Sequence, residues 1–163
     1  PLAAMAGREG IMRHFDKAAV GEEGFTFQIG TLSGNPLASV AGLKTLEVLR
    51  RAGSYETLYA HGKRLMAAMS DPLKAHGIPH QIVGAPVLFD VIFTGDPVLN
   101  YRDMAKGDKA RAATFNAAVR EKGVLKPGAK LYPHLALTEE DLLQTEAAFI
   151  HAAEQVAAMD NAA

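Results

Sequence analysis

Apolar residues recur at helical spacing along two adjacent stretches in the first half of the chain. One stretch carries an apolar residue at every third position: Leu37, Val40, Leu43, Leu46 and Leu49. This spacing predicts a helix with Asn35 as its N-cap, Pro36 in its first turn and Gly53 at its end. A second helical pattern runs from Ser54 to Gly77, and Asp71–Pro72 inside it predicts a kink or a restart.

After Gly77 the period of the pattern shortens. Two apolar or alternating runs, 80–83 and 87–94, are bounded by glycine and proline, which predicts the strands of a small antiparallel sheet. The pattern then predicts a helix over 108–122, a short strand at Val124–Leu125 and an extended segment over 131–137. The last helix should begin at Thr138, because Thr138-Glu139-Glu140-Asp141 has the form of a capping box. This order of elements is that of an α+β layer, with helices on one face of a sheet.

The composition bounds the possible partners. A chain of 163 residues with 48% hydrophobic content can bury a core and fits one domain, or a domain plus part of another. Seventeen basic and 18 acidic residues without a basic block make nucleic acid and anionic membrane poor partners. A small molecule or a protein is the expected partner.

The absence of cysteine and of long apolar stretches, and the way the chain begins, lead to further expectations. The chain has no cysteine, which excludes disulfides and thiolate metal sites and fits a reducing compartment. Its apolar stretches are too short for a bilayer and no leader opens it, so a cytoplasmic protein is expected. Because the chain begins at Pro1 with a run of small residues, we also expect further residues ahead of it.

The candidate chemistry lies in the turn Gly30-Thr31-Leu32-Ser33-Gly34-Asn35-Pro36. Glycine lets the backbone approach an anion, threonine offers a hydroxyl and an N–H, and the adjacent helix N-terminus favours negative charge, so phosphate is a suitable ligand. Taken alone, these residues are explained better by a plain turn and helix cap. Ser33 has no paired base, and six scattered histidines show no metal-ligand spacing, so neither a nucleophile nor a metal site is expected.

The wider sequence resembles the class III aminotransferases, especially the branch that contains glutamate-1-semialdehyde aminomutase. The resemblance rests on residues 30–38 with Ala41-Gly42-Leu43 and Thr45-Leu46, and it continues in order over nearly the whole chain. Further matches are Phe93-Thr94, Pro97-Val98, Asn100-Tyr101, Asp103, Asp108, Phe115, Gly123-Val124, Leu135-Ala136 and 138–141. Several short motifs in the right order are far more specific than any one of them.

The resemblance implies an α/β fold, the C-terminal part of a fold type I transferase that depends on pyridoxal 5'-phosphate. Residues 1–51 would end the large cofactor domain, 52–77 would be a connecting helix, and 78–163 would form a small C-terminal α+β domain. Thr31, with Gly30, would bind the cofactor phosphate of the neighbouring subunit, which implies a homodimer with shared active sites. The Schiff-base lysine of the family would lie ahead of Pro1, so this chain would hold no catalytic residue and would be inactive alone.

Two further residues are candidates for substrate binding by the same resemblance. Lys130 and His134 lie in a segment that passes near the active-site mouth in this family, and either could contact a substrate carboxylate; a solvated loop is the alternative. Residues 127–133 lack the glutamate that aminomutases carry there, which favours an aminotransferase that moves an amino group from an amino acid or amine to a keto acid, with a β- or ω-amino acid as a candidate donor. An intramolecular aminomutase and a cofactor-free dimerisation or scaffold relative remain alternatives.

Overall fold

The computed structural model describes residues 3–28 and 30–161 and divides the chain into two compact units. The first unit is Pro1–Arg51 and the second is Ala52–Ala163. The long helix α4 (Ser54–Ala75) belongs to the second unit. The assignment of these parts to a large domain, a connecting helix and a small domain stays a prediction.

The first unit is made of short helical pieces and one longer helix. They are α1 (Glu9–Met12), the 3-10 turn η1 (Arg13–Phe15), α2 (Lys17–Gly24) and α3 (Pro36–Leu49). His14 ties these pieces together, because its carbonyl accepts from the Thr26 N–H at 2.7 Å and its Nδ1 bonds the Gly24 carbonyl at 2.7 Å. None of the described side chains of this unit is buried, so it has no core of its own.

Helix α3 begins as its sequence predicts. Asn35 Oδ1 accepts from the Ala38 N–H at 3.1 Å, and Pro36 occupies the first turn, where its missing N–H costs no hydrogen bond. Four of the five apolar residues that predicted this helix remain exposed, and Leu49 is half-buried; the exposed ones are Leu37, Val40, Leu43 and Leu46.

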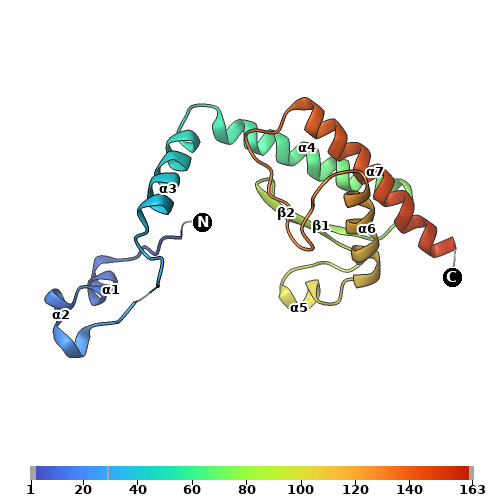
Figure 1. The fold of residues 1–163 in the computed structure, drawn as a ribbon. Coiled ribbons are helices and arrows are strands. Elements are labelled where there is room, and N and C mark those ends of the chain that lie inside the picture. Colours follow the sequence, from blue (N-terminus) through green and yellow to red (C-terminus); the bar gives the residue numbers. More distant parts are fainter. Residues whose placement is uncertain (1–2, 29, 162–163) are drawn as a thin grey trace. The chain divides into compact units, whose positions relative to one another are not determined.

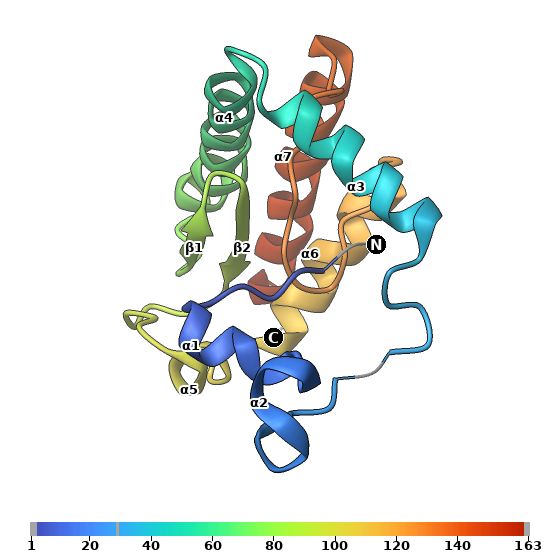
Figure 2. The ribbon, with the colours of Figure 1, turned by 90° about the vertical axis from the view of Figure 1, so that its left-hand side faces the viewer.

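The second unit packs three long helices and a hairpin around one core (Figure 1). Helix α7 (Glu139–Asn161) packs against both α4 and α6 (Lys109–Glu121). The strands β1 (Gln81–Ala85) and β2 (Leu88–Ile92) pair antiparallel, with Val83 opposite Asp90, and lie beside α4 (Figure 2). A short helix, α5 (Tyr101–Met104), precedes α6. The predicted antiparallel pair and the helices over 108–122 and from Thr138 are confirmed.

Aromatic rings hold the centre of this unit. Phe115 stacks on Phe149 with ring centroids 5.9 Å apart. The ring of Phe93 is tilted relative to that of Phe115, and their centroids are 5.7 Å apart. The largest fully buried side chains come from α4, β2, α6 and α7: Phe89, Phe115, Phe149, Met69, Leu73, Val119 and Val156. The hydrophobic burial of these residues supplies the main driving force for folding the unit.

The hairpin approaches α4 at a glycine. A Cβ added at Gly62 would lie 1.8 Å from the Pro86 carbonyl oxygen, which is far inside van der Waals contact. A glycine is therefore required at this position of the helix, because any side chain would push the hairpin turn away.

Helix α4 runs on through Pro72, so of the two outcomes predicted at Asp71–Pro72 the restart is wrong, and the kink stays a prediction. Met69 and Leu73, on either side of the proline, are both fully buried. Their burial holds the last turns of the helix in place although Pro72 lacks the N–H of a regular helical hydrogen bond.

The predicted strand at Val124–Leu125 is also wrong. Gly123 ends α6 in a left-handed conformation (φ 78°), and the Val124 N–H bonds back to the Val119 carbonyl at 3.3 Å. The backbone here satisfies a helix end and is unavailable to a sheet. In the extended segment over 131–137, only Leu131 pairs with a strand, at Phe89.

Candidate functional site

The turn before α3 is closed by its own backbone. The Gly30 carbonyl accepts from the Ser33 N–H at 2.8 Å, and the Leu32 carbonyl accepts from the Asn35 N–H at 3.1 Å. Gly34 has a φ of 71°, the left-handed region that glycine occupies without strain. The turn therefore delivers the chain directly into the N-cap of α3, as its sequence predicts.

A hollow of about 280 Å³ lies at this turn. Its lining combines Ala3 with residues of the turn and of the first turn of α3: Gly30, Leu32, Ser33, Gly34, Asn35, Ala38 and Ser39. A Cβ at Gly30 would come within 2.6 Å of the Ser33 hydroxyl, so a side chain there would displace that hydroxyl. The residues present fit a small anion, because the hollow has a glycine backbone, a serine hydroxyl and a helix N-terminus.

Thr31 is exposed within this turn. Its side-chain hydroxyl makes no hydrogen bond to another residue in the described part of the chain. The two groups that the sequence predicts as phosphate ligands are the hydroxyl of Thr31 and the backbone at Gly30. Both residues are exposed to solvent. Gly30 and Thr31 belong to the first unit, whereas Lys130 and His134 belong to the second.

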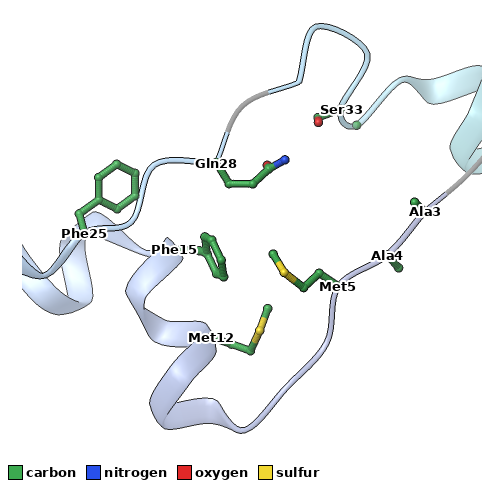
Figure 3. Close-up of a pocket in the computed structure, with 9 residues that line it drawn as sticks. Ala3, Ala4, Met5, Met12, Phe15, Phe25, Gln28 and Ser33 are labelled. Atoms are coloured by element: carbon green, nitrogen blue, oxygen red, sulfur yellow. The ribbon is translucent and has the colours of Figure 1, made fainter. Parts of the chain in front are cut away.

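A second hollow of about 570 Å³ shares Ala3, Ser33 and Gly34 with the first. Figure 3 shows Met5, Met12 and Phe15 pointing toward one another in it. The Ser33 turn therefore borders both hollows, and the second is lined by two methionines and two phenylalanines.

The second predicted site is the loop that follows α6. Lys130 has a φ of 72°, and its N–H donates to Asp90 Oδ2 at 2.9 Å. Its side chain is exposed and forms no ion pair with a described residue. His134 is exposed four residues later, and its carbonyl accepts from His61 Nδ1 at 3.4 Å. The structure thus places both candidates in one loop, separated by the buried Leu131 and Pro133.

The sequence interpretation missed two residues of this loop's support, Asp90 and Lys126. Lys126 is 3% exposed, and its Nζ lies 2.8 Å from Asp90 Oδ1. The available signal was Asp90 itself, a charged residue in the otherwise apolar run Leu88-Phe89-Asp90-Val91-Ile92. A buried charge of this kind requires a partner.

Two negative findings concern the described residues. Among residues 3–28 and 30–161, no three histidine or carboxylate side chains gather in a way that could hold a metal ion. Within the same residues, no helix combines the length and apolar character that crossing a membrane requires.

Comparison with known proteins gives the following matches; no family model matches the chain. It is 36% identical over 148 residues to glutamate-1-semialdehyde 2,1-aminomutase 2 of Brevibacillus brevis, which covers 89% of the chain and 33% of that protein. The structure of an ω-transaminase from Sphaerobacter thermophilus is similar over 92% of this chain and 34% of the transaminase chain (TM-score 0.74, 23% identity). The structure of a transaminase with PLP bound is similar over 96% of this chain and 35% of the transaminase chain (TM-score 0.78, 20% identity).

The chain spans about a third of the length of these proteins. Its likeness to the aminomutase is one of sequence, and its likeness to the two transaminases is one of fold. The resemblance to the class III aminotransferases is thereby confirmed, and the chain has the fold of the C-terminal part of a fold type I transaminase.

Proposed function

We propose that this chain forms the C-terminal third of a class III aminotransferase, an enzyme that moves an amino group from an amino acid or amine to a keto acid with pyridoxal 5'-phosphate. The observation that carries the proposal is 36% identity to an aminomutase across 89% of the chain, which includes the turn at Gly30–Pro36. The rest of the enzyme, with the lysine that holds the cofactor, would come from residues ahead of Pro1. A cytoplasmic location stays a prediction.

Gly30 and Thr31 would bind the phosphate group of the cofactor. Thr31 can donate from both its hydroxyl and its N–H, and the start of α3 adds a favourable dipole. When bound, the cofactor supplies an aldehyde that takes up amino groups and an aromatic ring that accepts electrons. The protein's contribution at this turn is binding and orientation.

The exposed position of Thr31 supports a ligand that approaches from outside the unit. We therefore propose a homodimer in which the turn of one subunit completes the site of the other. The lack of any buried side chain among the described residues of the first unit is consistent with packing against a larger body, which the residues ahead of Pro1 and the second subunit would supply.

Lys130 and His134 would meet the substrate carboxylate. Lys130 carries a positive charge on an exposed side chain, and the described residues do not neutralise it. A carboxylate and an ammonium form the strong, charge-assisted type of hydrogen bond. His134 adds a second donor four positions later in the same loop.

The second candidate function is that of an aminomutase, which moves the amino group within one substrate. The aminomutase from Brevibacillus brevis favours it, whereas the lack of an acid in residues 127–133 favours the aminotransferase. The two differ in their need for an amino acceptor. Turnover of an amino donor that stops when pyruvate or 2-oxoglutarate is withheld identifies the aminotransferase.

The decisive experiment measures cofactor binding by the full-length protein, with its preceding residues, and by its Thr31→Val variant. Loss of one hydrogen bond to a charged phosphate should weaken the affinity for pyridoxal 5'-phosphate about tenfold or more. Thr26→Val is the matched control, because Thr26 is also exposed in the first unit but lies outside the turn. A full-length dimer that stays colourless with added cofactor would overturn the proposal and favour a scaffold relative.

A further inference from the structure

The loop between α6 and α7 is anchored by a buried lysine. The side chain of Lys126 is 1% exposed, and its ammonium reaches three acceptors: Asp90 Oδ1 at 2.8 Å, Asn116 Oδ1 at 3.0 Å and the Pro127 carbonyl at 3.3 Å. An ammonium has three N–H donors, so this buried charge is fully satisfied. Removal of a charge from water is costly, and only such complete pairing makes it tolerable.

Asp90 connects this lysine to the backbone of Lys130. Its Oδ1 accepts from Lys126 and from the Val91 N–H at 2.9 Å, while its Oδ2 accepts from the Lys130 N–H at 2.9 Å. The side chain of Asp90 is 14% exposed, so water competes weakly for these bonds. One carboxylate thus joins strand β2, the buried lysine and the loop.

The backbone of Lys130 adopts an unfavourable, left-handed conformation in this position. Lys130 is the one non-glycine residue with a positive φ among those that the structure describes. A left-handed backbone is unfavourable for an L-residue and persists where the surroundings fix it. The bond from Asp90 fixes the Lys130 N–H, and the next residue is fixed by two backbone bonds between Leu131 and Phe89, at 2.6 and 3.2 Å.

The loop is therefore rigid where it carries its exposed cation. Asn116 adds another link, since it accepts from Lys126 and donates from Nδ2 to the Gly128 carbonyl at 3.4 Å. The side chain of Lys130 is exposed on this left-handed backbone, whereas that of the next residue, Leu131, is buried.

We propose that Asp90 and Lys126 are positioning residues, which hold Lys130 in its left-handed conformation and so aim its ammonium at the carboxylate of the substrate. This inference rests on the proposed function, since it assigns the direction of a group that the proposed enzyme would use. It predicts that the Asp90–Lys126 pair acts on substrate affinity through Lys130 alone.

The test compares two amino donors in the full-length enzyme, with saturating pyruvate: β-alanine, and propylamine, in which a methyl group replaces the carboxylate. Lys130→Ala should raise KM for β-alanine about tenfold, the value of one charge-assisted hydrogen bond, and leave kcat nearly unchanged. KM for propylamine should stay within about twofold of wild type, because it offers no carboxylate. Lys109→Ala, an exposed lysine at the start of α6, is the control.

The positioning role is tested with Asp90→Leu/Lys126→Met, a double variant that removes both buried charges and, with them, the acceptor for the Lys130 N–H. It should raise KM for β-alanine selectively, and adding Lys130→Ala to it should have no further effect, because all three residues act on one contact. Lys130→Gly should keep the loop conformation and lose the affinity, because glycine accepts a positive φ without strain.

Amide hydrogen exchange at residue 130 gives a second measurement that is independent of activity. The double variant should exchange this amide about tenfold faster than wild type if Asp90 holds it. Equal exchange, or a KM that rises equally for both donors, would overturn the inference while the enzyme remains an aminotransferase. A wild-type enzyme that turns over neither donor and binds no cofactor would instead overturn the proposed function and this assignment with it.

Discussion

Arg64 donates two parallel hydrogen bonds to Glu139, from Nη1 to Oε2 at 2.7 Å and from Nη2 to Oε1 at 2.8 Å. Its Nε also donates to Glu146, two turns further along α7. The guanidinium thus joins α4 to α7 at two points, and its planar fork suits this bidentate geometry. Lysine could not reproduce it.

The Arg64 contact should make stability depend on pH. The hydrogen bond from Arg64 is the main cause that lowers the pKa of Glu139 below its ordinary value. A carboxylate with a lowered folded-state pKa contributes stability above its unfolded pKa, and this contribution is lost as the pH falls through the folded pKa. Arg64→Met should therefore reduce stability at neutral pH and flatten its decline in acid.

Urea unfolding between neutral and strongly acidic pH checks this prediction. Arg120→Met serves as the control, because Arg120 is exposed on α6 and its side chain pairs with no described residue. If the stability of Arg64→Met falls in acid as steeply as that of wild type, Glu139 is not the group that titrates.

The start of α7 depends on a reciprocal cap. The Asp141 N–H donates to Thr138 Oγ1 at 3.2 Å, and Asp141 Oδ2 accepts from the Thr138 N–H and hydroxyl at 2.8 and 2.7 Å. Thr138→Ala removes the hydroxyl from both bonds and should cost about 1 kcal/mol in urea unfolding. Thr57→Ala, on the exposed side of α4, should change stability by less than about 0.5 kcal/mol. Equal effects of the two changes would contradict a capping role.

Gly62 should not tolerate alanine. The added methyl would collide with the Pro86 carbonyl, and neither the helix nor the hairpin turn is a flexible side chain that can move aside. We expect Gly62→Ala to destabilise the second unit by about 3 kcal/mol in thermal or urea unfolding. Gly95→Ala is a fair comparison, because its nearest contact would be an ordinary 3.8 Å to Pro79. A stable Gly62→Ala variant would mean that the hairpin is not seated on α4.

The stacked ring of Phe149 should carry a large share of the core. It is fully buried against Phe115, and truncation leaves a cavity that the close-packed helices cannot refill. Phe149→Ala should cost about 4 kcal/mol in urea unfolding. Leu143→Ala, a 53% exposed position on the same helix, should cost less than about 0.5 kcal/mol.

Features that depend on neighbours in the chain could be predicted from the sequence. Asn35 caps α3 and Thr138 caps α7 through residues three positions away, so the pattern contains both partners. The strands on either side of Pro86 followed from their short apolar runs. The turn at Gly30–Pro36 could be predicted for the same reason, because its hydrogen bonds join residues only three positions apart.

Features that depend on distant residues could not be predicted. Asp90 and Lys126 meet across 36 positions, and Arg64 meets Glu139 across 75, so periodicity holds no information about either pair. At Val124 a β-branched residue favoured a strand, but the end of α6 had already engaged its N–H. Local propensity was overridden there by the neighbouring helix.

The absence of a buried side chain among residues 3–28 and 30–51 has a consequence for how this chain can be engineered. A screen that selects variants by heat resistance reports on residues whose burial holds a body together, and in the described chain those lie beyond Arg51. When this chain is screened by itself and without cofactor, substitutions in the turn before α3 would pass unnoticed, whatever they do to ligand binding. A library that targets this turn therefore has to be sorted by what it binds.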